Sequence, residues 1–95
     1  MNLYEINFEN SSTYWNFYEA IINGMRFPNW CGKNADAIWD MLTTHIKTPS
    51  IIYLKNINGI SCELEEEKNI IFSIFSKTEN WYKEINKSVK IIFMD

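Results

Sequence analysis

The sequence contains few residues that break or cross-link a chain: two cysteines, two prolines and three glycines among 95 residues. No apolar run approaches the roughly 20 residues of a transmembrane helix, and no basic flank leads into an apolar N-terminal stretch. Basic residues are also scarce, since 9 Lys and Arg stand against 12 Asp and Glu and form no stripe that would bind a phosphate backbone. We therefore expect no membrane span, no secretion signal and no direct binding to nucleic acid.

Apolar side chains are abundant, at 46% of the chain with 16% aromatic residues, which is too many for a disordered protein. The length allows one domain, over residues 1–95, and no second core. A domain with this much core material needs no disulfide, and without a secretion signal we expect a reducing, cytoplasmic location. Cys31 and Cys62 are accordingly predicted to be free thiols.

Hydrophobic periodicity divides the chain into alternating strands and helices. Strands are predicted at residues 4–8, 51–54 and 89–93, the second of them buried on both faces. A first helix begins after a hydroxyl N-cap in residues 11–13, carries its apolar face on Tyr14, Phe17, Tyr18, Ile21 and Ile22, and ends at Gly24 as a C-cap. Further helices are predicted at residues 35–44, capped by Asn34, and from 66 to about 78, with Ile70, Ile71, Ile74 and Phe75 on one face. Residues 56–65 suggest a short helix or turn, and residues 80–88 a loop or a broken helical extension.

Strands separated by helical segments favour a parallel sheet, because parallel neighbours need crossover connections. The expected fold class is therefore α/β, with a three-stranded parallel sheet packed against three or four helices.

The helix at residues 35–44 has two dissimilar faces when its residues advance by about 100° each. Ile38, Met41, Leu42 and His45 fall on one side, which suits a core-facing surface and places the only histidine inward. The other side carries Asp36, Trp39, Asp40 and Thr43, and burial in the core does not explain that group. Trp30 and Gly32 lie just before this helix and extend the same patch.

Two interpretations fit this polar and aromatic face. In the structural one, Asp36 only complements the positive end of the helix dipole and Trp39 folds under a neighbouring loop. In the functional one, the aromatic rings supply contact area while the carboxylates select a cationic partner. Asp36 and Asp40 are one turn apart, so they repel one another until a positive partner neutralises them.

The segment Phe27-Pro-Asn-Trp-Cys-Gly-Lys-Asn-Ala-Asp-Ala-Ile-Trp-Asp-Met-Leu-Thr43 resembles the signature of the barstar family. In that family a Pro-aromatic-x-Gly-x-Asn loop leads into a helix reading Asp-Ala-x-Trp-Asp. The resemblance implies a small α/β inhibitor that binds a toxic ribonuclease one to one and blocks its active site, without catalysis, cofactor or metal. It also implies which residues contact the partner: Trp30, Gly32, Asn34, Ala35, Asp36, Trp39, Asp40 and Thr43. Asp40 would take the place of a substrate phosphate, and Asp36 would reach a second cation.

Three features depart from the family pattern. Cys31 replaces an aromatic residue, Lys77 stands where an acidic contact residue of the last helix is expected, and the segment 80–88 looks longer than usual. From these departures we expect a cognate enzyme other than the familiar one, such as a toxin domain delivered by a competing bacterium.

Two other functional classes remain open from the residues alone. Asp36 and Asp40 could hold a divalent metal and assist phosphodiester hydrolysis, although two acids without other convergent groups make a poor site. Alternatively, the domain could be a regulatory interaction module whose partner is not a nuclease.

Overall fold

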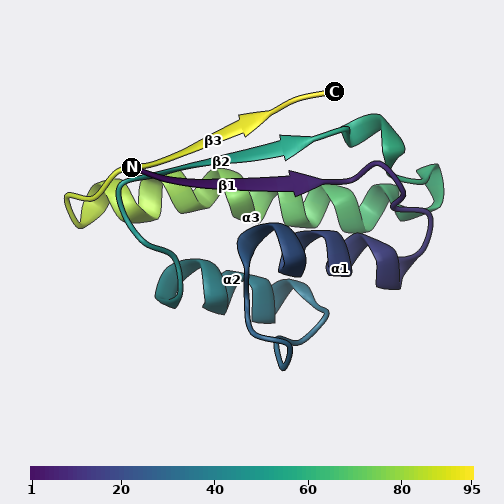
Figure 1. Ribbon diagram of the computed structural model, residues 1–95, viewed down its shortest axis with the longest axis horizontal. Helices are drawn as coiled ribbons and strands as arrows, with labels where there is room; N and C mark the ends of the chain where they lie inside the picture. Colours follow the sequence, from purple (N-terminus) through teal and green to yellow (C-terminus); the bar gives the residue numbers. More distant parts are fainter.

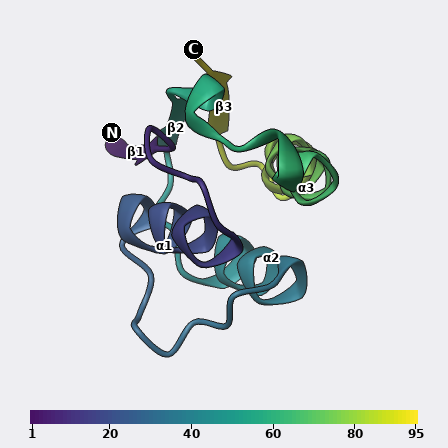
Figure 2. The ribbon, with the colours of Figure 1, turned by 90° about the vertical axis from the view of Figure 1, so that its right-hand side faces the viewer.

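The computed structural model describes all 95 residues as a parallel sheet with helices on one of its faces (Figures 1 and 2). The elements run in the order β1 (Asn2–Asn7), α1 (Tyr14–Met25), α2 (Ala35–Thr44), β2 (Ser50–Lys55), η1 (Ile57–Gly59), η2 (Cys62–Leu64), α3 (Glu65–Glu84) and β3 (Val89–Phe93), where η1 and η2 are short 3-10 helices. The strand order is β1-β2-β3 and both pairings are parallel. This arrangement confirms the predicted α/β class with its three-stranded parallel sheet.

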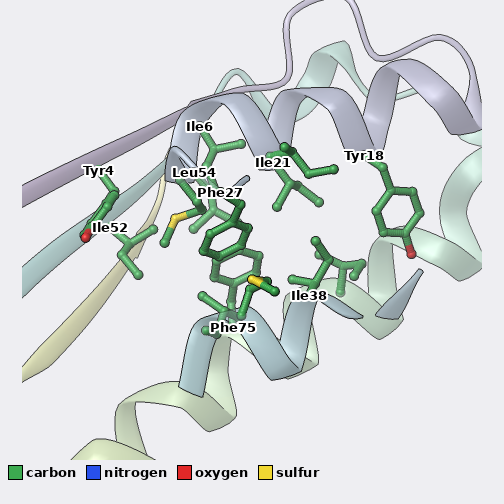
Figure 3. Packing of buried hydrophobic residues seen from close by; sticks show 14 of the residues in the cluster. Tyr4, Ile6, Tyr18, Ile21, Phe27, Ile38, Ile52, Leu54 and Phe75 are labelled. Atoms are coloured by element: carbon green, nitrogen blue, oxygen red, sulfur yellow. The ribbon is translucent and has the colours of Figure 1, made fainter. Parts of the chain in front are cut away.

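The core lies between the sheet and the three α-helices. Figure 3 shows residues of the sheet, of the three α-helices and of the loop after α1 meeting there: Tyr4, Ile6, Ile52, Leu54, Tyr18, Ile21, Phe27, Ile38 and Phe75. Alternate residues of β1 and β2 point into this core, because successive side chains of a strand face opposite sides. No helix of the structure is both long enough and apolar enough to cross a bilayer.

The prediction that β2 is buried on both faces is wrong. Ile52 and Leu54 are fully buried, whereas Ile51 and Tyr53 on the opposite face are only partly covered. The reason is that all three α-helices lie on one side of the sheet (Figure 2), so the other face lacks the second helical layer usual for parallel strands.

Helix α1 does not end at Gly24. It continues to Met25, and Arg26 closes it in the left-handed conformation with φ 57°. Gly24 instead lies against β1, where an added Cβ would sit 2.5 Å from the carbonyl oxygen of Glu5 and 2.7 Å from Cα of Ile6. This glycine is needed for the close approach of helix and strand, which sequence periodicity does not reveal.

Helix α3 is longer than predicted, because it continues through residues 80–84, where we expected a loop or a broken extension. The buried side chains of Thr78 and Tyr82 hold this last part of the helix against the rest of the fold. The Tyr82 hydroxyl donates a hydrogen bond to the carbonyl of Leu42 in α2, and burial raises the pKa of that phenol. The extension therefore ties α3 to α2, the helix that carries the predicted contact residues.

Candidate functional site

Helix α2 begins where the sequence predicts, because Asn34 caps it. The Asn34 side-chain oxygen accepts a hydrogen bond from the backbone N–H of Ala37 at 2.8 Å, and Asn34 itself is extended with φ −155°. Asp36 lies in the first turn, where a carboxylate stabilises the positive end of the helix dipole. The Asn34 cap thus sets the residue at which α2 starts, while the buried Ile38, Met41 and Leu42 set which side of the helix faces the core.

The two faces of α2 differ as predicted. Ile38, Met41 and Leu42 are buried in the core, whereas Asp36 and Asp40 are exposed. Neither carboxylate belongs to any of the three ion pairs of the molecule, which join Lys33 to Glu19, Lys55 to Glu5 and Lys68 to Glu65. Two like charges one helical turn apart are therefore left without a cationic partner inside the chain.

Trp39 is not simply on the water-facing side of α2, because it is half-buried. Its ring packs edge to face against Trp81 of α3, with the ring centroids 6.4 Å apart. The half-buried Thr43 donates its hydroxyl to the backbone carbonyls of Trp39 and Asp40, at 3.0 and 3.1 Å. Trp39 thus packs on α3 rather than under a neighbouring loop, the carboxylates remain outside any ion pair, and recognition of a cationic partner stays a prediction.

The loop before α2 combines buried anchors with an exposed aromatic residue. Phe27 and Cys31 are buried, and the Cys31 amide donates to the carbonyl of Pro28 at 3.0 Å. Burial raises the pKa of the Cys31 thiol, an effect that the nearby charge of Lys33 partly offsets. Trp30, between these two anchors, is 71% exposed, so the anchored loop presents a large apolar side chain to solvent.

His45 is exposed, which contradicts its predicted inward position. It is the C-cap of α2 rather than part of the helix, so helical periodicity does not apply to its side chain. Its ring lies edge to face with Trp30, at 6.0 Å between centroids, and its Nδ1 lies 2.8 Å from the Thr44 hydroxyl oxygen. The histidine therefore borders the candidate site, and the sequence analysis missed this position.

Gly32 lies where the loop passes closest to the start of α2. An added Cβ there would be 3.1 Å from Nδ2 of Asn34 and 3.2 Å from Cβ of Ala37, tighter than ordinary contacts. Glycine thus allows the loop to fold down onto the capped helix end. Ala35 is half-buried at the same end, in the first turn of α2.

A shallow groove of about 500 Å³ runs between α2 and α3 beside the candidate site. Its lining residues come from the first turn of α2 and from one side of α3: Ala35, Asp36, Asn69, Ile70, Ser73, Ile74 and Lys77. Ile70 was predicted on the same helix face as Ile71, Ile74 and Phe75, but unlike buried Ile71 and Phe75 it is 45% exposed, in this groove. The groove brings Lys77, one of the departures from the family pattern, onto the same surface as Asp36.

The three-dimensional arrangement offers few groups for metal binding. No three His, Cys, Asp or Glu side chains converge in a way that could hold a metal ion. The two thiols are unpaired, with Cys31 buried and Cys62 exposed. What the surface presents is two free carboxylates, an exposed indole and a rigid helix, which are groups suited to recognising another molecule.

Comparison with known proteins agrees with this geometry. The family described as barstar (barnase inhibitor) matches residues 1–94, almost the whole chain. The chain belongs to the barstar family. The chain is also similar to a curated Bacillus subtilis (strain 168) protein that bears the name "Putative ribonuclease inhibitor YrdF". The two are 25% identical over 75 residues, which is 79% of each chain.

Proposed function

We propose that this protein inhibits a ribonuclease by inserting α2 and the preceding loop into the active-site cleft of the enzyme. The observation that carries this proposal is the pair of exposed carboxylates, Asp36 and Asp40, on a rigid helix, neither of which forms an ion pair within the chain. The family description and the name of the Bacillus subtilis relative support the same class of partner.

The chemistry of the partner explains why free carboxylates are useful. A ribonuclease cleft binds phosphate groups, so it presents Arg, Lys and His side chains in fixed positions. A carboxylate on a helix can occupy the place of a phosphate, and it contains no phosphodiester bond for the enzyme to cleave. The inhibitor thus acts by occupancy, one to one, and performs no catalysis itself.

Each predicted contact residue has a distinct part in this proposal. Asp40 enters the centre of the cleft, and Asp36 meets a second cation near its rim. Trp30, Trp39 and Thr43 supply contact area around the two charges, where buried aromatic rings contribute most. The remaining three, Gly32, Asn34 and Ala35, form the tight loop-to-helix junction that fixes the direction of α2.

The biological setting is also part of the proposal. We infer that the cognate enzyme is a toxic ribonuclease and that the inhibitor works as an immunity protein in the cytoplasm of the cell that needs protection. Lys77 supports a partner different from barnase, because it places a positive charge on the groove that adjoins Asp36. Opposite net charges of inhibitor and enzyme would also accelerate their encounter.

The test is a titration of RNA cleavage. The protein is co-expressed with the product of the adjacent gene, the complex is purified, and its two components are then separated. The isolated inhibitor is titrated into RNA-cleavage assays of that gene product and, in parallel, of barnase. We expect the adjacent ribonuclease to lose its activity at a one-to-one ratio with the inhibitor. Full RNA cleavage by both enzymes in the presence of excess inhibitor, or a stable complex with a partner that is not a nuclease, contradicts the proposal.

A further inference from the structure

Lys33 lies in the middle of the candidate site, between Gly32 and Asn34, yet its contacts point away from α2 toward α1. Three side chains of α1 converge on it. The Tyr14 hydroxyl donates to the Lys33 carbonyl at 2.5 Å, the Lys33 Nζ lies 4.0 Å from the centroid of the Trp15 ring, and the same Nζ is 3.9 Å from Oε2 of Glu19. We call Tyr14, Trp15 and Glu19 the α1 clamp.

The clamp residues lie at the edge of the hydrophobic core, where the Tyr14 ring packs against the buried Tyr18 ring with 4.8 Å between centroids. Tyr14 was predicted on the apolar face of α1 but is 45% exposed, and Trp15 is 60% exposed. Neither belongs to the buried cluster that fills the space under the sheet. Trp15 and Glu19 are four residues apart, so both reach the same side of the helix. Two large exposed aromatics and one acid thus share a single neighbour in the loop.

We propose that the α1 clamp is a set of positioning residues that hold the loop in its binding conformation before the partner arrives. This inference rests on the proposed function, because it assumes that the loop and α2 form the contact surface. The hydrogen bond from Tyr14 fixes the backbone one residue before the Asn34 cap. Contacts with the other two clamp residues fix the Lys33 side chain, which is only 20% exposed.

The clamp has a second effect, on charge. A cation between Gly32 and Asn34 would repel a basic ribonuclease cleft if its side chain were free to enter the interface. Held against the Trp15 ring and beside the Glu19 carboxylate, the Lys33 ammonium is kept on α1 and its charge is partly compensated. The clamp thereby allows a lysine in a loop that lies beside two carboxylates used for binding.

A double variant, Tyr14→Phe with Trp15→Ala, removes the hydrogen bond and the ring contact while leaving the core intact. The first readout is amide hydrogen exchange of the free protein. We expect the Cys31 and Ala37 amides, which are bonded within the loop and its cap, to exchange about 5- to 30-fold faster. The sheet amides of Ile52 and Leu54 should keep their protection, because the clamp lies outside the core.

The second readout is the affinity for the ribonuclease that the parent protein inhibits. We expect the double variant to bind about 5- to 30-fold more weakly, since part of the binding energy is then used to order the loop. Trp15→Phe keeps an aromatic face over Lys33 and should bind within about 3-fold of the parent. Asn23→Ala, an exposed change on the same helix away from Lys33, should alter neither readout.

The outcomes separate the two proposals. Unchanged exchange at Cys31 and Ala37 overturns the clamp, whether or not a ribonuclease is inhibited. Faster exchange with unchanged affinity overturns the positioning role while the inhibitor function stands. If the parent protein inhibits no ribonuclease, the proposed function fails and the positioning role fails with it, whereas the exchange data still decide whether α1 orders the loop.

Discussion

Replacing Asp40 with alanine should separate binding from stability. The Asp40 carboxylate is exposed, takes part in no ion pair and accepts no side-chain hydrogen bond, so its removal breaks no ion pair or hydrogen bond within the chain. Alanine is the better helix former by up to about 0.5 kcal/mol, and loss of the repulsion from Asp36 adds about 0.2–0.5 kcal/mol. The free energy of unfolding should therefore rise by about 0.2–1 kcal/mol, which is about 1–8 °C in Tm for a domain of this size.

The effect on binding should have the opposite sign. Truncating a charged group that is desolvated against cations costs about 2–5 kcal/mol, or roughly 30- to 5,000-fold in Kd, much of it from the unpaired cations left on the enzyme. That range is the general one for a charge that is buried and paired at a protein–protein interface.

Urea unfolding and inhibition of RNA cleavage measure the two quantities on the same preparations. Asp95→Ala is the matched control, because it removes the same charge at the C-terminus, on the opposite side of the molecule from α2 (Figure 1). The reasoning is refuted if Asp40→Ala inhibits as well as the parent protein. It is also refuted if that variant loses more than about 1 kcal/mol of stability, since the carboxylate would then have a partner inside the fold.

Further substitutions test the site and the fold. Trp30→Ala should change the free energy of unfolding by less than about 0.5 kcal/mol but raise the Kd for the ribonuclease at least about 10-fold, as measured by titration calorimetry. Trp39→Ala should weaken binding and also lower stability, by about 1–3 kcal/mol in urea unfolding, because this ring packs on α3. Gly24→Ala should destabilise by at least about 2 kcal/mol, although the same change stabilises most helices; equal or higher stability would contradict the close approach to β1. Iodoacetamide should modify one thiol per folded chain, at Cys62, with Cys31 reacting only on unfolding because it is buried and its thiol pKa is raised; rapid modification of both would contradict the buried loop.

The main elements of the fold could be predicted from the sequence because local signals mark them. Alternation in β1, the Asn34 cap and the apolar face of α2 each indicate an element with the observed type and position. The end of α3 could not be predicted in this way. Residues 79–84 have weak helical signals, and they stay helical because Trp81 and Tyr82 find partners on α2, which are distant in sequence.

The candidate site was only partly predictable for the same reason. The free carboxylates follow from helix periodicity, because Asp36 and Asp40 lie opposite Ile38. Local patterns do not show that Trp39 is shared with α3, that Ile70 is exposed in a groove, or that α1 holds Lys33. Each of these depends on which helices become neighbours, and only the tertiary structure determines that.

Competition for the active site tests the central claim most directly. The inhibited ribonuclease is titrated with a nucleoside monophosphate that occupies its phosphate-binding cleft, and binding of the inhibitor is followed by calorimetry. If the carboxylates of α2 take the place of the phosphate, the apparent Kd of the inhibitor rises in proportion to the nucleotide concentration. An apparent Kd that stays constant when the cleft is saturated with nucleotide would show that the inhibitor binds elsewhere on the enzyme.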